Sequence, residues 1–278
     1  PKDFHDTWDL DGTDFTPEAS PDDEGYWDDF ENIVLNGNYE ELGSELVTNG
    51  GFDTDSNWTF AGTNGSISNG VGVFPDTTNN YIIQSNVVPA SVKTYKLVYE
   101  IIESNGGGLG LAGGSSAFGG VNLTSSVGVH TKFLTSNGTQ RNLQFNNQAS
   151  FIGKIDNISL KQVDPNDRWN LGTGWTISDG KAHADVSSTA ALSQTLSTGA
   201  GNTYEITLTI SNFTEGSIQP QFGGILATPV SANSNGTHTF KITATGSSSG
   251  LLLYAINTSA FSIDDVQVKE YAITPLDV

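Results

Sequence analysis

The sequence contains no cysteine and no methionine, and only 11 of its 278 residues are lysine or arginine. The lack of cysteine excludes disulfide cross-links and thiolate metal centres. Eleven basic residues against 31 acidic ones give a formal net charge of -20, which repels phosphate backbones and anionic lipid surfaces. We therefore expect no nucleic acid among the partners of this protein.

Long apolar runs are also missing. No run approaches the roughly 20 residues that a membrane-spanning helix needs, so we expect no membrane insertion. The opening PKDFHDTWDL lacks the basic-then-apolar order of a secretory signal, which indicates a leader that was removed or none. Glycine, with 32 residues, and abundant serine, threonine and asparagine favour short strands joined by tight turns over long helices.

The acidic residues are concentrated at the N-terminus. Residues 1–45 hold 15 aspartates and glutamates against one lysine, a net charge of -14. A purely solvating acidic tail would lack aromatic side chains, whereas this segment contains Phe4, Trp8, Phe15, Tyr26, Trp27, Phe30 and Tyr39. We predict that residues 1–45 form an extended anchoring arm whose aromatic side chains dock onto a partner.

From residue 46 the pattern changes to alternating apolar and polar residues. The segments YKLVYEI (95–101) and YEITLTI (204–210) are examples. A period of two residues is typical of strands that bury one face and expose the other. The rest of the chain is therefore predicted to form antiparallel β-sheets.

The two halves of this β-rich region repeat one another. Trp58 matches Trp175, Tyr95 matches Tyr204, and GVHTKF (128–133) matches GTHTF (236–240). The closing strands FIGKIDNISLKQV (151–163) and AFSIDDVQVKEY (260–271) match as well. A repeat of about 110 residues suits an independent sandwich domain. The predicted domains are 46–163 and 168–272, with a linker at 164–167 and a tail at 273–278.

The ends of the first copy carry a family resemblance. ELVTNGGFDTDSNWTF (45–60) and IDNISLKQV (155–163) resemble the first and last strands of carbohydrate-binding-module-like jelly rolls of the galactose-binding-like superfamily, domains that tailed-phage structural proteins often contain. The resemblance implies two antiparallel sheets packed face to face. The predicted fold class is therefore all-β, with two tandem β-sandwich domains behind an extended acidic arm.

The same resemblance implies a structural Ca²⁺ near the terminal strands. Its oxygen ligands would come from Asn49, Gly51, Asp53 and Asp156. The alternative is that Asp156 only accepts backbone hydrogen bonds at a strand start. In the second copy NDRWN (166–170) replaces NGGFD, and Arg168 would repel a cation, so we expect no calcium there. No other cofactor is expected.

Four aromatic residues, Phe74, Tyr81, Phe118 and Phe222, lie near glycine-rich loops and are candidates for a glycan-binding or interface surface. The alternative is that they fill the sandwich cores, which is also the role expected for the two repeated tryptophans. Neither a paired set of catalytic carboxylates nor a nucleophile motif is evident. We therefore do not expect an enzyme.

Two functions remain open. The first is a non-enzymatic virion protein of a tailed phage, a capsid decoration or tail accessory subunit that docks through residues 1–45 onto other virion proteins in a symmetric or homo-oligomeric assembly. The alternative is a glycan-binding module pair of a secreted or cell-surface protein, with cell-surface glycan as its partner. The first places the protein on the virion surface and the second in the extracellular space.

Overall fold

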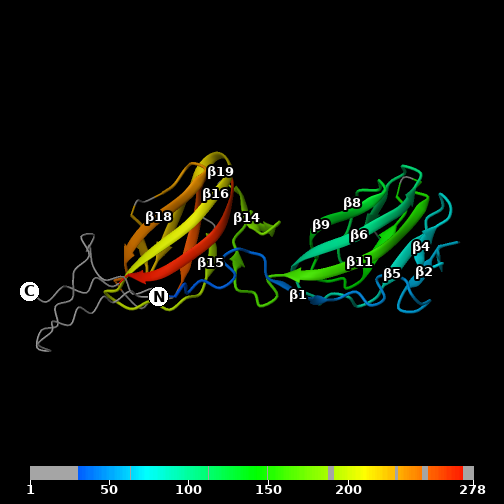
Figure 1. Cartoon of the computed structure of the whole chain (residues 1–278), viewed down its shortest axis with the longest axis horizontal. Helices are drawn as coiled ribbons and strands as arrows, with labels where there is room; N and C mark the ends of the chain where they lie inside the picture. The colour runs from blue at the N-terminus through cyan, green and yellow to red at the C-terminus, as the bar shows by residue number, and fades with distance from the viewer. Residues whose placement is uncertain are drawn as a thin grey trace, which may run out of the picture.

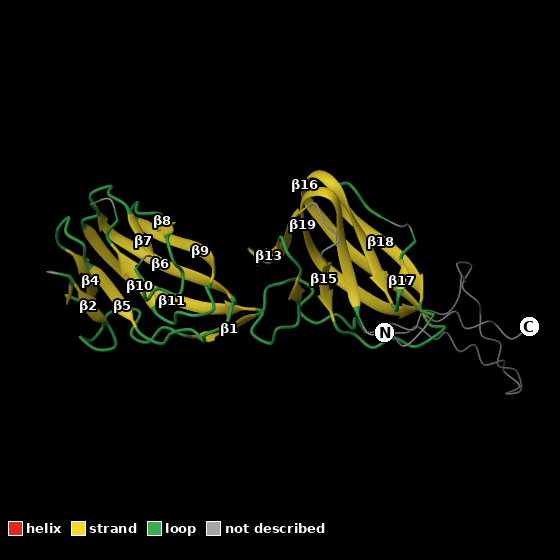
Figure 2. Cartoon of the chain, turned by 180° about the vertical axis from the view of Figure 1, so that it is seen from behind, coloured by secondary structure: helices red, strands yellow, loops and turns green. Residues whose placement is uncertain are grey.

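The computed structural model describes residues 31–62, 64–111, 113–148, 150–186, 191–228, 231–245 and 250–271. Throughout this part of the chain the regular elements are β-strands, which form two sandwiches arranged end to end (Figures 1 and 2). No helix in these ranges could cross a bilayer. The prediction of an all-β chain with two tandem antiparallel sandwiches is confirmed.

The first sandwich consists of two sheets. One contains, in order, β3 (Ser66–Ser68), β4 (Val71–Phe74), β11 (Gly153–Val163), β6 (Thr94–Ser104) and β9 (Gly128–Thr135), with β1 (Leu42–Glu45) paired to β11. The other contains β2 (Thr59–Ala61), β5 (Tyr81–Gln84), β10 (Leu143–Asn146), β7 (Leu109–Leu111) and β8 (Val121–Leu123). All of these strand pairs are antiparallel.

Two long strands, β16 (Thr203–Phe222) and β19 (Leu251–Tyr271), run through both sheets of the second sandwich. The first half of β16 and the second half of β19 lie with β13 (Trp175–Ser178), β14 (Lys181–Val186) and β18 (Gly236–Thr243). Their other halves lie with β12 (Asn170–Leu171), β15 (Ala191–Gln194) and β17 (Ile225–Leu226). Register shifts between Ser211 and Ser217 let β16 bend from one sheet into the other.

Each sandwich has its own apolar core, built by the alternation that the sequence shows. In β6 every second side chain from Tyr95 to Ile101 is buried, and in β16 the same holds from Tyr204 to Ile210. The ring of Tyr95 meets that of Phe118 edge-on at 5.6 Å, and Tyr204 meets Phe222 edge-on at 5.0 Å. The predicted equivalence of the two tyrosines is confirmed.

The second sandwich is completed by residues that precede the first. The backbone N–H of Ile33 donates to the carbonyl oxygen of Val268, and that of Val266 donates to Gly37, each at 3.0 Å. Val34 and Tyr39 are buried in the core of the second sandwich. Residues 42–163 are therefore inserted into a second sandwich made of residues 31–41 and 164–271, and in Figure 1 the blue start of the described chain lies beside the red end of β19.

Residues 33–40 match residues 46–53 both in sequence and in the contacts that they make. The amide side chain of Gln84 bonds the N–H and the carbonyl of Thr48 at 2.9 and 2.7 Å, and Gln194 bonds both groups of Leu35 at 2.8 Å. Trp169 stacks at a tilt on Tyr39 as Trp58 does on Phe52, both with ring centroids 5.1 Å apart. The two sandwiches thus open with the same structural unit.

A glycine is required at one position of this repeated unit. A Cβ at Gly37 would lie 2.1 Å from the carbonyl oxygen of Val266, and one at Gly50 would lie 2.0 Å from that of Ile158. Both contacts are with backbone atoms, which cannot rotate away. The glycine therefore lets the opening loop lie directly against the closing strand of its own sandwich.

These contacts correct three predictions. Residues 31–41, assigned to the arm, belong to the second sandwich, and Tyr39 is a core residue with 1% exposure, so it cannot dock onto a partner. The structural counterpart of Trp58 is Trp169, which precedes β12 as Trp58 precedes β2. The counterpart of NGGFD is NGNYE (36–40) and not NDRWN (166–170). The remaining arm aromatics, Phe4, Trp8, Phe15, Tyr26, Trp27 and Phe30, lie outside the described residues.

Candidate functional site

The sheet β2-β5-β10-β7-β8 turns one face toward the core and one face outward. On β10, Leu143 and Phe145 enter the core, so Gln144 and Asn146 project from the outer face. Tyr81 of β5 lies directly opposite Asn146, and Ile83 lies opposite Gln144. Opposed side chains in an antiparallel pair touch, so this face presents a tyrosine, an isoleucine and two carboxamides in adjacent rows.

Both carboxamides are buried, and that of Gln144 is held by a hydrogen bond from a neighbouring loop. The hydroxyl of Ser115 donates to Oε1 of Gln144 at 2.6 Å, and the exposures of Gln144 and Asn146 are 4% and 6%. Oδ1 of Asn146 is buried without a hydrogen-bond partner. Since an unsatisfied buried acceptor costs about 1–3 kcal/mol, this oxygen is a site where a hydroxyl donor would stabilise the protein.

Tyr81 stands beside a loop that is held rigid by hydrogen bonds. Nδ2 of Asn79 donates to the Tyr81 hydroxyl at 2.8 Å. In the same loop Asp76 accepts hydrogen bonds from the side chain of Thr78, from Asn64 and from Asn80. These bonds, led by that of Thr78, lower the pKa of the Asp76 carboxyl from 3.8 to about 2. The loop therefore positions Tyr81 at the edge of the outer face.

The second sandwich also turns a tyrosine opposite a carboxamide outward on the corresponding sheet, but on the neighbouring strand pair, because Tyr254 takes the place of Asn146 in the register of β15 with β19. Tyr254 of β19 lies opposite Gln219 of β16, and Leu252 lies opposite Gln221. Their neighbours Ile218, Phe222, Leu251 and Leu253 fill the core, so these four side chains face outward. All four are partly exposed. Within the described chain, Tyr254 and Gln219 make no side-chain hydrogen bonds, so their polar groups are free to bind a ligand.

Three of the four aromatics proposed from the sequence are not on this surface. Phe74, Phe118 and Phe222 are buried to 1% exposure or less and belong to the cores. Only Tyr81 lies on an outer face. Trp58 and Trp175 are also core residues, at 6% and 3% exposure, as the sequence indicated.

Five residues of these outer faces were not predicted from the sequence: Gln144, Asn146, Gln219, Gln221 and Tyr254. A usable signal was present: LQFN (143–146) and IQPQF (218–222) each alternate carboxamides with residues that fill the core. In a strand with one face buried, such carboxamides must lie together on the other face. The prediction used proximity to glycine-rich loops in place of this alternation, and that criterion selected phenylalanines that are buried.

Asn49, one of the residues expected to bind calcium, is already hydrogen-bonded within its own loop, and calcium binding stays a prediction. Nδ2 of Asn49 donates to the carbonyls of Thr54 and Ser56 at 2.7 and 2.9 Å, and its own carbonyl accepts the indole N–H of Trp58. The described residues contain no group of three or more histidine, cysteine or acidic side chains that could hold a metal. Burial, with Glu100 and Asp53 nearby, raises the pKa of Asp156.

The two paired histidines have structural partners. Nε2 of His130 lies 2.6 Å from the carbonyl oxygen of Ser126, and Nε2 of His238 lies 2.8 Å from that of Ser234. Each histidine thus bonds to the turn four residues before it. The recurrence of this contact indicates a structural role for both histidines.

No protein-family model and no curated protein sequence matches the chain. Among solved structures, it is similar to the N-terminal CBM22-1–CBM22-2 tandem domain of Paenibacillus barcinonensis Xyn10C, at 14% identity over 82% of this chain and 98% of that one, with a TM-score of 0.30. The tandem CBM51 modules of Sp3GH98, a family 98 glycoside hydrolase of Streptococcus pneumoniae SP3-BS71, match at 8% identity over 72% and 83%, with a TM-score of 0.25. At these values the function must be argued from the residues of this chain.

Proposed function

We propose that the protein is a glycan-binding module pair in which each sandwich binds neutral carbohydrate on the outer face of the sheet that carries its tyrosine. The observation that supports this most is that the corresponding sheet of each sandwich turns a tyrosine opposite a carboxamide outward: Tyr81 opposite Asn146 in the first and, one strand pair along the sheet, Tyr254 opposite Gln219 in the second. The residues differ between the copies, but in both a tyrosine ring stands beside a carboxamide.

These side chains suit the chemistry of a sugar. A carboxamide offers both donors and an acceptor, which match the hydroxyl groups of a pyranose. A tyrosine ring packs on the apolar face of the sugar ring while its own hydroxyl stays hydrogen-bonded. The outer faces described above are uncharged, and the chain as a whole carries a net charge of -20, which disfavours anionic glycans.

The second sandwich is the more open of the two. Tyr254, Gln219 and Gln221 are partly exposed, whereas Gln144 and Asn146 lie beneath neighbouring residues at 4% and 6% exposure. A ligand therefore reaches the carboxamides of the second sandwich without rearrangement. In the first sandwich the ligand contacts Tyr81 and Ile83 directly. It reaches Asn146 only if the residues that bury Asn146 move.

A glycan array with the full chain tests the proposal, followed by titration calorimetry with the best neutral glycan. Tyr254→Ala and Gln219→Ala should each weaken binding, because they remove the ring and the carboxamide of the open face. Thr207→Ala is the matched control, since Thr207 lies on the same strand in the other sheet. Absence of binding to any neutral glycan would exclude the proposal.

The virion-subunit hypothesis depends on the docking arm. Its aromatic residues up to Phe30 lie outside the described residues, and Tyr39 is buried in the second core. No contact described above favours a capsid or tail partner, so docking to virion proteins and symmetric assembly stay predictions. Secretion or cell-surface attachment is the setting that we propose with glycan binding.

A further inference from the structure

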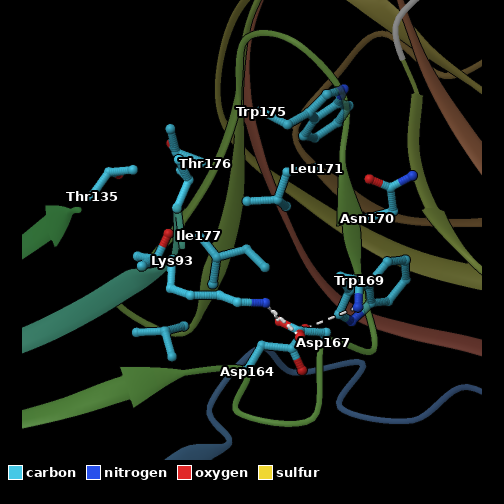
Figure 3. A pocket seen from close by; sticks show the side chains of 13 residues that line it. Lys93, Thr135, Asp164, Asp167, Trp169, Asn170, Leu171, Trp175, Thr176 and Ile177 are labelled. Carbon is cyan, nitrogen blue, oxygen red and sulfur yellow. Dashed lines mark hydrogen bonds and ion pairs between the residues drawn. The ribbon is translucent and has the colours of Figure 1, made fainter. Parts of the chain in front are cut away.

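A cavity of about 650 Å³ lies between the two sandwiches (Figure 3). Thr94 and Thr135, at adjacent ends of β6 and β9, line it from the first sandwich. Asn170 and Leu171 of β12 and the β13 pair Thr176 and Ile177 line it from the second. The cavity exists only because the inserted sandwich sits against its host.

The lining combines an apolar floor with free polar groups. Leu171 and Ile177 lie near the centre of the site, and Trp175 lies above them in Figure 3. Thr135 and Thr176 are exposed and make no side-chain hydrogen bond within the described chain. A few polar groups around an apolar surface are typical of small-molecule sites, which commonly occupy 300–1,000 Å³ and favour domain interfaces.

The charges in the cavity cancel or are already engaged. Nζ of Lys93 in the first sandwich lies 2.5 Å from the carboxylate of Asp167 in the connection to the second. The carboxylate of Asp164 accepts from Nδ2 of Asn36 at 3.1 Å and from the backbone N–H of Trp169 at 2.9 Å. One lysine against two aspartates leaves a net charge of -1, which disfavours an anionic ligand, and both oxygens of Asp164 are already hydrogen-bonded, so the lining favours a neutral ligand.

We propose that this cavity is a further binding site, in which a neutral oligosaccharide is held between the two sandwiches. The inference rests on the proposed function, because it is that function which makes carbohydrate the expected ligand. The hydroxyl and amide groups of Thr135, Thr176 and Asn170 bond the sugar hydroxyls, and Leu171 and Ile177 contact its apolar face. The ligand then touches both sandwiches and holds their relative orientation.

Nuclear magnetic resonance of the ¹⁵N-labelled full chain tests this site, with neutral β-linked tetrasaccharides of glucose, xylose and galactose as probes. The indole N–H signal of Trp175 reports on the cavity, and that of Trp58, in the core of the first sandwich, is the internal reference. We expect a probe to shift the Trp175 signal and leave the Trp58 signal in place.

Two variants fill the cavity from opposite walls. Thr135→Phe and Thr176→Phe should each weaken the binding that shifts Trp175 at least tenfold, and both sites are exposed enough to accept the ring without unfolding. Thr131→Phe, on the same strand as Thr135 but outside the cavity, is the control and should bind as the wild type does. Tyr254→Ala should leave the Trp175 response unchanged.

The outcomes separate the two proposals. A probe that binds through Tyr254 while Trp175 stays unmoved would overturn the cavity site and leave the proposed function standing. A Trp175 shift that persists in both phenylalanine variants would also overturn the cavity site. If none of the tetrasaccharides binds anywhere on the chain, both proposals fail.

Discussion

The indole N–H of Trp169 donates a hydrogen bond of 2.9 Å to the backbone carbonyl oxygen of Asn36, 133 residues earlier in the chain. Trp58 makes the same bond to Asn49, nine residues earlier, at 2.8 Å. One local contact in the first sandwich has thus become a long-range contact in the second. The difference arises because the whole first sandwich is inserted between the two partners.

Fragments of the chain should fold according to this nesting. Residues 42–167 contain every strand of the first sandwich and should fold alone. Residues 164–271 should fail to fold, because they lack Val34, Tyr39 and the backbone partners of Val266 and Val268. Adding residues 31–41 through a short glycine-serine linker should restore the fold. Circular dichroism and thermal unfolding would decide, and a cooperative transition in 164–271 alone would contradict the nesting.

The opening loop of each sandwich lies directly against its closing strand, which leads to a second prediction. Gly37→Ala and Gly50→Ala should each destabilise their own sandwich by about 1–3 kcal/mol, because the added Cβ must displace a backbone carbonyl. Gly114→Ala is the control, since nothing lies within 4 Å of its Cβ position, and should change stability by less than about 0.5 kcal/mol. Urea unfolding measures the stability of all three variants. An equal loss of stability in all three would show that the close approach of loop and strand does not require glycine.

The low pKa of Asp76 predicts a dependence of stability on pH. Its folded-state pKa of about 2 lies below the unfolded value of 3.8. The carboxylate therefore contributes to stability fully above about pH 4, and this contribution is lost as the pH falls through 2. Asp76→Asn should lower the urea midpoint at pH 6, and the deficit should vanish near pH 2. A deficit that stays constant over this range would refute the assignment.

Asp156 should behave in the opposite sense. Burial, with Glu100 and Asp53 nearby, raises its folded-state pKa, so its negative charge destabilises the fold as the pH rises above the ordinary range of an aspartate. Asp156→Asn should raise the thermal midpoint at pH 7 in the absence of calcium. Millimolar CaCl₂ provides the control for the calcium expectation, because a bound cation would stabilise the wild type and not the variant.

The sequence was sufficient to predict the sandwiches but not their connection. Alternation in 95–101 and 204–210 predicts strands that the structure confirms as parts of β6 and β16, because one-sided burial leaves a period-two pattern. The insertion of the first sandwich into the second was not predicted, because NGNY (36–39) lies in a strongly acidic stretch. Its charge assigned it to the arm, although its sequence matches NGGF (49–52). The sequence repeat therefore pairs Trp58 with Trp175, whereas in the structure the counterpart of Trp58 is Trp169, six residues earlier.

The candidate surface was harder to predict for a physical reason. Whether an aromatic residue faces the core or the solvent depends on strand register, and a shift of one residue reverses it. Phe222 and Gln221 are neighbours in the chain, yet one fills the core and the other faces outward. Register follows from pairing with distant strands, so proximity to glycine-rich loops could not separate the two.

The most direct test of the account is the dissociation constant of the full chain for a neutral glycan, compared with that of the double variant Tyr81→Ala/Tyr254→Ala. If both outer faces bind carbohydrate, losing the two rings should weaken binding at least tenfold, equivalent to about 1.4 kcal/mol, while the urea midpoint changes little. Unchanged affinity in the double variant would contradict the central claim that these tyrosines form the binding surfaces.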